Sequence, residues 1–352
     1  MLKKFILFLF AATVSYSAHA DDKAFIATVY DTIVTKHLTP VDIEEIAIAG
    51  LKSISATDNN LVFSDGNDNI YLYSHRQIAG VWHKPQKKDD IKSWAEITSG
   101  IIDKAVKISP TARKNEIFMT ENILYHATAA LADHSKYRFS DEVEEDIESA
   151  KISARLDGNF LYIQILSFDN NTPEYVKNSI LRYPAIKAVI IDLRGNKGGP
   201  LNIAIDIAKL FIDDGIIVTT KGKENDSTKY YIAHQDEAFS LPLAVLVDQN
   251  TASSAEALAA ALHEQAQAAL IGTQTFGKGT IQSIFAFDNG GKLALTTEEF
   301  FTPSGSKIQN IGIWPDYCII NDQLVDGPCT RQERAGNSTD IEFAKQVLSE
   351  QL

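Results

Sequence analysis

Three short segments of the sequence carry residues that could take part in acyl-transfer chemistry. They are D-L-R-G-N-K-G-G at residues 192–199, N-T-A-S-S-A-E at residues 250–256 and G-T-Q-T-F-G-K-G-T-I-Q at residues 272–282. A serine hydroxyl is a poor nucleophile until a neighbouring base takes its proton, and a lysine serves as that base when desolvation lowers its pKa. Ser253 and Lys278 are therefore candidates for a nucleophile and its base.

Each segment taken alone has a simpler structural explanation. Glycines at a strand-to-helix turn often serve only the tight turn. Ser253 followed by Glu256 fits the capping box of a helix N-terminus. A lysine between two glycines, as at Lys278, is more often found in a solvated turn than in an active site. A catalytic interpretation therefore depends on the three segments acting together.

The third segment also comes close to a phosphate-binding loop of the form G-x-x-x-x-G-K-[ST]. Gly279 stands where that loop needs a metal-binding hydroxyl, and residues 281–287 are typical of a strand where a helix is required. We therefore do not expect nucleotide binding. His263 and Glu264 are not followed by a second histidine at helical spacing, so no metal site is indicated and no cofactor is expected.

In this order and spacing the three segments resemble the motifs of peptidase family S41, the carboxy-terminal processing or tail-specific proteases. Those motifs run D-L-R-x-N-x-G-G, S-A-S-A-S-E and T-F-G-K-G-x-x-Q, and the lysine here follows the serine by 25 positions (278 − 253). The resemblance runs from about residue 160 to residue 316 and includes F-T-P-S-G at 301–305 and G-I-W-P-D at 312–316. Upstream, L-A-D-H-S at 131–135 is similar to the family's L-D-P-H-S element.

The resemblance implies a serine endopeptidase with a Ser/Lys dyad. Ser253 matches the family nucleophile, Lys278 its general base and Gln282 the residue that orients the lysine. The backbone N–H groups of Gly199 and Ser254 match the oxyanion hole, with Gly198 as the alternative first donor. The implied fold is an α/β layered core of the Clp-protease/crotonase-like type.

The chain departs from the family pattern in two respects. Thr251 and Ala255 stand where the S-A-S-A-S-E motif has its first and third serines. Family members usually carry a PDZ domain after the His-Ser element, whereas only about a dozen residues separate Ser135 from Glu148. No PDZ domain is therefore expected, and recognition of a substrate's free C-terminus stays an open question.

Hydrophobic patterns divide the chain into regions of different predicted secondary structure. Residues 21–148 are predicted to be a mainly helical N-terminal region with a short hairpin at 61–73. Residues 149–320 are predicted to form the α/β peptidase core, and residues 321–352 a loop and a final helix. The helices predicted in the N-terminal region and at the end of the chain lie at residues 24–36, 41–53, 91–106, 117–132 and 340–352.

Strands and helices alternate in the predicted core. The predicted strands lie at residues 160–166, 188–193, 216–220, 243–247, 269–272 and 281–287. The predicted helices lie at residues 173–181, 203–211 and 254–265. Ser253 thus falls on a strand-to-helix elbow, beside a helix N-terminus that favours an oxyanion.

The first residues of the chain predict export. Lys3 and Lys4, an apolar run at residues 5–14 and A-H-A at 18–20 form the pattern of a signal peptide over residues 1–20. We expect a periplasmic or secreted protein without membrane insertion after cleavage, because no later run approaches about 18 apolar residues.

The only two cysteines, Cys318 and Cys329, are expected to pair in an oxidising compartment. A metal site built on their thiolates is the less favoured alternative, because no histidine or third cysteine lies nearby.

Charge and composition restrict the partners. The formal net charge of −13 becomes −15 (−13 − 2) without Lys3 and Lys4, and no basic cluster is interleaved with aromatic residues, so nucleic acid is not an expected partner. Protein or peptide substrates are expected, and the oligomeric state stays open. Two other functions also stay open: a non-catalytic crotonase-like ligand-binding protein, and an esterase that uses the same dyad.

Overall fold

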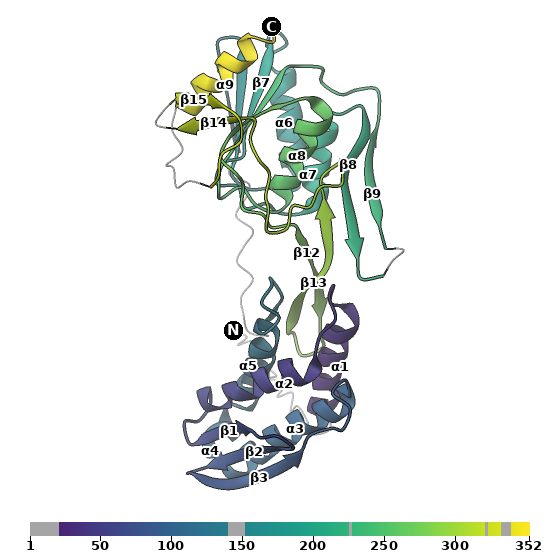
Figure 1. Cartoon of the computed structure of the whole chain (residues 1–352), viewed down its shortest axis with the longest axis vertical. Coiled ribbons are helices and arrows are strands. Elements are labelled where there is room, and N and C mark those ends of the chain that lie inside the picture. The colour runs from purple at the N-terminus through teal and green to yellow at the C-terminus, as the bar shows by residue number, and fades with distance from the viewer. Residues whose placement is uncertain (1–20, 140–151, 225–226, 321–322, 332–338) are drawn as a thin grey trace, which may run out of the picture. The chain divides into compact units, whose positions relative to one another are not determined.

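The structure is a computed structural model that divides into two compact units (Figure 1). Unit 1 comprises Met1–Asp141 and Ile284–Leu295, and unit 2 comprises Glu142–Ser283 and Thr296–Leu352. The structure describes residues 21–139, 152–224, 227–320, 323–331 and 339–352. The predicted signal peptide and the acidic segment at residues 141–148 lie outside the described residues.

Unit 1 is mainly helical, as the sequence predicts, and its helices bury one common core. Its helices are α1 (Asp21–Lys36), α2 (Ile43–Leu51), the 3₁₀ helix η1 (Lys52–Ala56), α3 (Ile91–Ile108), α4 (Pro110–Lys114) and α5 (Glu116–Ala129). Tyr30 of α1 and Trp94 of α3 are fully buried in this core. The side chain of Asp42 caps α2 by accepting the N–H groups of Glu44 and Glu45, which sets where that helix begins.

A small antiparallel sheet of order β1-β2-β3 completes this part of unit 1. Its strands are β1 (Leu61–Asp65), β2 (Asn69–Ser74) and β3 (Gln77–His83). The predicted hairpin is confirmed, but β3 was not predicted. The turn between β2 and β3 consists of His75 and Arg76, and both have positive φ. Glycine or asparagine usually marks such a turn in a sequence, and neither is present here.

A later stretch of the chain also belongs to unit 1. In β13 (Lys292–Phe301), residues Lys292, Leu293 and Ala294 pair antiparallel with β4 (Lys136–Arg138). Leu293 and Leu295 are fully buried among the helices of unit 1. Residues 284–295 are therefore part of unit 1, although their sequence position falls within the predicted core region.

Unit 2 is built on a seven-stranded sheet of order β15-β14-β11-β10-β7-β6-β5. Its strands are β5 (Ile152–Asp157), β6 (Phe160–Ile165), β7 (Ala188–Asp192), β10 (Leu243–Val247), β11 (Ala269–Gly272), β14 (Tyr317–Ile320) and β15 (Gln323–Asp326). The five inner strands of this sheet run parallel to one another: β6, β7, β10, β11 and β14. The edge strands β5 and β15 are antiparallel to their neighbours. β7 and β10 are buried along their whole length, as expected for parallel strands covered on both faces.

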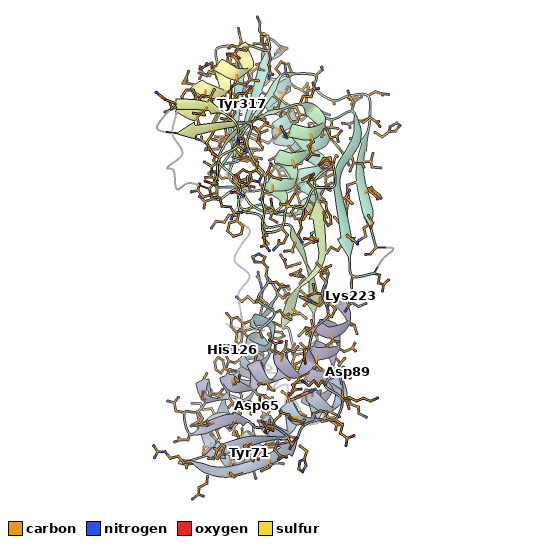
Figure 2. All side chains as sticks on the ribbon, viewed as in Figure 1. Asp65, Tyr71, Asp89, His126, Lys223 and Tyr317 are labelled. Carbon is orange, nitrogen blue, oxygen red and sulfur yellow. A yellow bond between two sulfur atoms is a disulfide. The ribbon has the colours of Figure 1, made fainter. Side chains whose placement is uncertain are left out.

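Helices cover both faces of this sheet (Figure 1). They are α6 (Thr172–Leu181), α7 (Leu201–Lys209), α8 (Ser254–Ala266) and α9 (Thr339–Ser349). Val189 and Ile191 of β7 pack with α6, α7 and α8, whereas Ala188 and Ile190 pack with α9 on the opposite face. Tyr317 of β14 also packs against the α9 cluster (Figure 2). The predicted α/β layered core is thus confirmed.

Other strands of unit 2 lie outside that sheet. β8 (Asp214–Gly222) pairs antiparallel with β9 (Lys229–His234) and with the later half of β13, and β12 (Thr280–Ala286) begins within the third candidate segment, two residues after Lys278. The prediction of a loop after residue 320 was wrong for β15, which forms a hairpin with β14.

The predicted disulfide between Cys318 and Cys329 is confirmed. No helix in the described part of the chain is long and apolar enough to cross a membrane. The described residues also hold no group of three or more His, Cys, Asp or Glu side chains that could bind a metal ion.

Candidate active site

The three candidate segments all begin at the same edge of the main sheet of unit 2. They follow the parallel strands β7, β10 and β11, which lie side by side in the sheet. Because parallel strands end at the same edge, the segments converge there, and this edge is where open α/β sheets bind ligands.

Ser253 lies on a sharp elbow between β10 and α8. Its φ of 60° and ψ of −129° belong to a region that residues other than glycine rarely adopt. The preceding Thr251 helps to hold this conformation, since it is fully buried and its hydroxyl donates to the Leu193 carbonyl at 2.9 Å. Thr251 therefore keeps a hydroxyl where the family motif has a serine. Backbone strain of this kind persists where the surrounding structure fixes it, often at functional sites.

The glycine turn after β7 is held by the side chain of Asn196, which is fully buried. Its amide nitrogen donates to the Ile165 carbonyl at 2.9 Å, and its amide oxygen accepts the Gly198 N–H at 2.8 Å. Its backbone carbonyl accepts the N–H of Ala252, on the elbow, at 2.9 Å. One residue therefore connects the sheet, the glycine turn and the serine elbow.

The turn and the elbow approach so closely that one position must be glycine. A Cβ on Gly198, which has φ 91°, would lie 2.9 Å from the Cβ of Ser253. The N–H of Gly198 is already donated to Asn196, whereas the N–H groups of Gly199 and Ser254 have no acceptor among the described residues. Ser254 is also the first residue of α8, so its N–H belongs to the electropositive end of a helix. These two N–H groups are available to an oxyanion.

The loop that carries Lys278 is fixed by backbone contacts on both sides of the lysine. The carbonyl of Gly277 accepts the Asn310 N–H at 2.8 Å, and the carbonyl of Gly279 accepts the Phe300 N–H at 2.8 Å. Gly277 has φ 86°, and a Cβ there would lie 3.0 Å from the Gly312 nitrogen. The two glycines around Lys278 therefore allow tight contact with neighbouring backbone rather than a solvated turn.

The side chain of Lys278 is partly buried, and burial lowers its pKa from the ordinary value of 10.5. Within the described ranges no carboxylate pairs with its ammonium group. A nearby anion would favour the charged form and raise the pKa, so the lack of such a partner allows desolvation to dominate.

Glu256 connects the serine elbow to the lysine loop, a role that the sequence analysis did not predict. It forms the expected capping box with Ser253, whose N–H donates to its carboxylate at 2.8 Å. The same carboxylate accepts the N–H groups of Gly277 at 2.7 Å and Lys278 at 2.9 Å, and the hydroxyl of Thr275 at 2.5 Å. One buried side chain therefore fixes the main chain at both candidate catalytic residues.

The donors around Glu256 match its ionised form. Thr275 accepts the Ile313 N–H at 2.7 Å, so the hydrogen of its hydroxyl is free to be donated to Glu256. All four partners then donate, and both carboxylate oxygens accept. Burial raises the pKa of Glu256, and the four hydrogen bonds oppose that rise. A carboxylate in the first turn of an alanine-rich helix was the signal in the sequence, because a carboxylate that is buried there needs several donors.

A pocket of about 310 Å³ brings the predicted residues together. It is lined by all five of them: Ser253, Lys278, Gln282, Gly199 and Ser254. The amide nitrogen of Gln282 donates to the Thr280 and Thr296 hydroxyls at 3.1 and 3.3 Å, and no hydrogen bond to Lys278 is found in the described part of the chain. The remaining lining residues are Lys197, Pro200, Leu201, Thr280, Ile281 and Phe300.

His263 does not join this pocket. It lies in the last turn of α8, at the opposite end of the helix from Ser253, and its Nδ1 lies 3.1 Å from the Ala268 carbonyl oxygen. The geometry gives no support to a histidine base from this helix.

The fold and the pocket define an α/β protein that presents a serine, a lysine and free N–H donors at the carboxyl edge of a parallel sheet. A model of peptidase family S41 matches residues 159–319. This segment, which includes every residue that lines the pocket, belongs to peptidase family S41.

Curated relatives support this assignment. A carboxy-terminal-processing protease of Bartonella bacilliformis is 35% identical over 184 residues, which are 50% of this chain and 42% of that protein. A carboxy-terminal processing protease of Bacillus subtilis is 40% identical over 161 residues, which are 45% of this chain and 34% of that protein. The chain thus spans less than half the length of these two relatives.

One solved structure is similar over most of the chain. A lipoprotein from Streptococcus agalactiae aligns with 90% of this chain and 99% of its own, with a TM-score of 0.52 and 19% sequence identity. At this identity the likeness concerns the fold alone.

Proposed function

We propose that the protein is a serine endopeptidase that uses Ser253 as nucleophile and Lys278 as general base. The observation that carries this proposal is that Ser253, Lys278, Gly199 and Ser254 line one and the same pocket. Serine and lysine supply nucleophile and base, and the two unengaged N–H groups supply stabilisation of a developing oxyanion.

The reaction begins when a peptide carbonyl enters the pocket. Neutral Lys278 takes the hydroxyl proton of Ser253 as Oγ attacks the carbonyl carbon, and the carbonyl oxygen becomes an oxyanion. The N–H groups of Gly199 and Ser254 bind this oxyanion, and each donor contributes on the order of 3 kcal/mol to the transition state.

The tetrahedral intermediate then collapses. The Lys278 ammonium gives its proton to the leaving amine, the C–N bond breaks and an acyl ester on Ser253 remains. Neutral Lys278 next takes a proton from water as the water oxygen attacks this ester. The same proton returns to Ser253 Oγ when the acid product leaves.

The lowered pKa of Lys278 suits this role. An ordinary lysine is almost fully protonated near neutral pH and cannot accept the serine proton. Burial disfavours its charged form, so a larger fraction is neutral at the operating pH. We assign Gln282 to the orientation of the lysine, since both line the pocket and two threonine hydroxyls hold its amide nitrogen.

The substrates proposed are proteins or peptides. The names of the curated relatives suggest cleavage near a carboxyl terminus. The signal-peptide pattern of residues 1–20 supports a location in the periplasm or outside the cell as part of this proposal. N-terminal sequencing of the protein purified from whole cells and medium would contradict this location if the chain still began at Met1.

Ser253→Ala tests the proposal. This variant should lose peptide hydrolysis and labelling by a fluorophosphonate probe while it keeps its fold, because the lost cap costs only about 1 kcal/mol. Turnover of unfolded casein, probe labelling and circular dichroism are measured beside Ser179→Ala, a partly exposed serine of α6 outside the pocket that should behave like the native protein.

The outcomes separate the three candidate functions. Undiminished casein turnover by Ser253→Ala would rule out this serine as nucleophile. If the native protein were neither labelled nor active, a binding protein would be favoured. If it were labelled and cleaved small esters but no peptide, an esterase would be favoured.

A further inference from the structure

The ionisable residues that line the pocket are all basic. Of the described residues that line it, only Lys197 and Lys278 are ionisable, and none is acidic. Lys278 must be neutral to act as the base in the proposed reaction. Lys197 is then the remaining positively charged side chain that lines the pocket. A substrate that enters therefore meets one fixed positive group.

Lys197 is not neutralised by the protein. Its ammonium group has no ion pair or hydrogen bond within the described ranges. Arg194, only three positions earlier, is bound instead by Asp192 and Asp340, each at 2.6 Å. Lys197 thus keeps its charge available to a ligand.

The backbone beneath Lys197 is held in place. The preceding Asn196 is fully buried, and the following Gly198 donates its N–H to the Asn196 side chain at 2.8 Å. The lysine side chain is exposed, but it starts from a fixed turn at the edge of the pocket. A cation placed this way costs little ordering of the main chain when it binds an anion.

The rest of the pocket wall offers a carboxylate no other counterion. Pro200, Leu201, Ile281 and Phe300 are apolar, so they accept the aliphatic part of a side chain but not its charge. An anionic group on the substrate would therefore depend on Lys197, whereas a lysine or arginine side chain would be repelled by it.

We infer that Lys197 binds a carboxylate of the substrate close to the scissile bond. The carboxylate belongs either to an Asp or Glu side chain or to the free C-terminus of the peptide. This inference rests on the proposed peptidase function and assigns its substrate class. Because the ammonium is largely exposed, the preference should be roughly three- to fivefold in kcat/KM for each carboxylate, the range of an exposed ion pair.

A peptide series tests the inference. One peptide is made with Glu in place of Gln at each position on either side of the cleaved bond, and its C-terminus is either a free acid or an amide. The Glu/Gln and acid/amide ratios of kcat/KM are measured for the native enzyme, Lys197→Gln, Lys197→Glu and Lys187→Gln. Lys187 is the matched control, since it is exposed and lies at the opposite end of strand β7.

The expected ratios differ between the variants. The native enzyme and Lys187→Gln should favour the carboxylate at one position, Lys197→Gln should lose that preference, and Lys197→Glu should invert it. The native preference should also weaken as salt is raised from low to physiological ionic strength. The ratio that changes identifies a side-chain or a terminal carboxylate. A preference that is absent in the native enzyme, or unchanged in Lys197→Gln, overturns the inference.

A binding measurement separates this inference from the catalytic proposal. The same peptides are titrated onto Ser253→Ala and onto the double variant Ser253→Ala/Lys197→Gln. If the native protein cleaves nothing but the carboxylate preference in Kd depends on Lys197, the inference stands and the peptidase proposal fails. If peptides are cleaved and the preference in Kd is the same in both proteins, the peptidase proposal stands and the inference fails.

Discussion

Two of the loops that line the pocket each contain a lysine among glycines, and they differ in what holds them. Both follow a parallel strand and contain glycines with positive φ, the first after β7 and the second after β11. The glycine turn is held by its own residue Asn196 and by two contacts with the serine elbow region, in which Asp248 accepts the Gly195 N–H and the Ser254 hydroxyl donates to the Gly199 carbonyl. The lysine loop is held by groups from distant parts of the chain, namely Glu256, Gln309 and Arg331.

The buried carboxylates beside the two loops differ in the same way. Asp192, before the glycine turn, is fully buried and paired with Arg194 through two hydrogen bonds of 2.8 and 2.6 Å. Glu256, beside the lysine loop, is equally buried but is held by N–H groups and one hydroxyl, with no cation among its described partners. The contacts of Asp192 neutralise its charge with a guanidinium group, whereas the contacts of Glu256 fix the positions of backbone N–H groups.

The difference matters for the proposed role of Lys278 as the base. A carboxylate paired with the Lys278 ammonium would raise its pKa and keep the lysine protonated. Glu256 lies close to Lys278 but accepts its backbone N–H, and its other acceptor positions are taken by Gly277, Thr275 and Ser253. The acid thus positions the lysine without pairing with it.

The largest expected effect comes from Lys278 itself. Lys278→Arg should be as inactive as Lys278→Ala, with kcat/KM at least about a thousandfold below that of the native enzyme. Arginine keeps the positive charge, but it stays protonated at any usable pH and cannot take the Ser253 proton. Near-native peptide turnover by a folded Lys278→Arg protein would show that the lysine serves only as a charge.

The pH profile of the native enzyme provides the matching measurement. Because burial lowers the pKa of Lys278, its neutral form is gained as pH rises through that lowered value, and kcat/KM should rise with it. The midpoint of this limb should lie well below about 10, where an exposed lysine titrates. A limb centred near 10 would contradict a desolvated base.

Glu256→Gln should have the next largest effect. The amide keeps the shape but replaces one acceptor oxygen with an NH₂ group, which then faces N–H donors that it cannot satisfy. We expect a loss of about 2 to 4 kcal/mol in the free energy of unfolding and a roughly 10- to 100-fold fall in kcat, because the backbone at Ser253 and at Lys278 should shift.

Urea unfolding and peptide turnover are compared with Glu237→Gln, an exposed acid in the same unit. Below the urea concentration at which unfolding begins, the kcat of Glu256→Gln should stay low. Full activity of the folded variant would mean that Glu256 contributes to stability alone.

The sequence predicted what depends on local pattern and on the order of the motifs. Strands such as Leu243–Val247 and Ala269–Gly272 were predicted to the residue, because short apolar runs bounded by turn residues mark buried parallel strands. The five pocket residues could be named because the motif spacing resembles a known family. The network of Glu256 could not be predicted, since its partners are backbone groups that only the folded chain brings near.

The edge strands were the other part that the sequence did not reveal. β9 has its large residues Tyr230 and Ile232 exposed, and β15 is only four residues long with a polar residue at each end, so neither shows the apolar run or the inward-facing pattern of a buried strand. Their pairing partners, β8 and β14, define them as strands. Such strands depend on neighbours that the local sequence does not specify.

The smallest expected effect comes from the disulfide, which bears on the lysine loop through the tail. The Cys329 carbonyl accepts the Gln274 N–H at 3.2 Å, and the Arg331 guanidinium donates to the Thr275 carbonyl at 2.8 Å. The bond between Cys318 and Cys329 keeps these contacts in place. Replacing both cysteines with serine should lower the free energy of unfolding by about 2 to 3 kcal/mol and kcat/KM only about two- to fivefold, because Glu256 still holds the loop.

Arg331→Ala separates the two contributions of the tail. With the disulfide intact, this variant should keep most of the thermal stability but lose activity to about the same extent as the double serine variant, since it removes the contact with Thr275 and leaves the covalent loop closed. Thermal unfolding and kcat/KM are measured for both proteins. If Arg331→Ala were fully active while the serine pair lost activity, the tail would act on the fold as a whole rather than through the lysine loop, and the dependence of that loop on distant residues would reduce to Glu256 and Gln309.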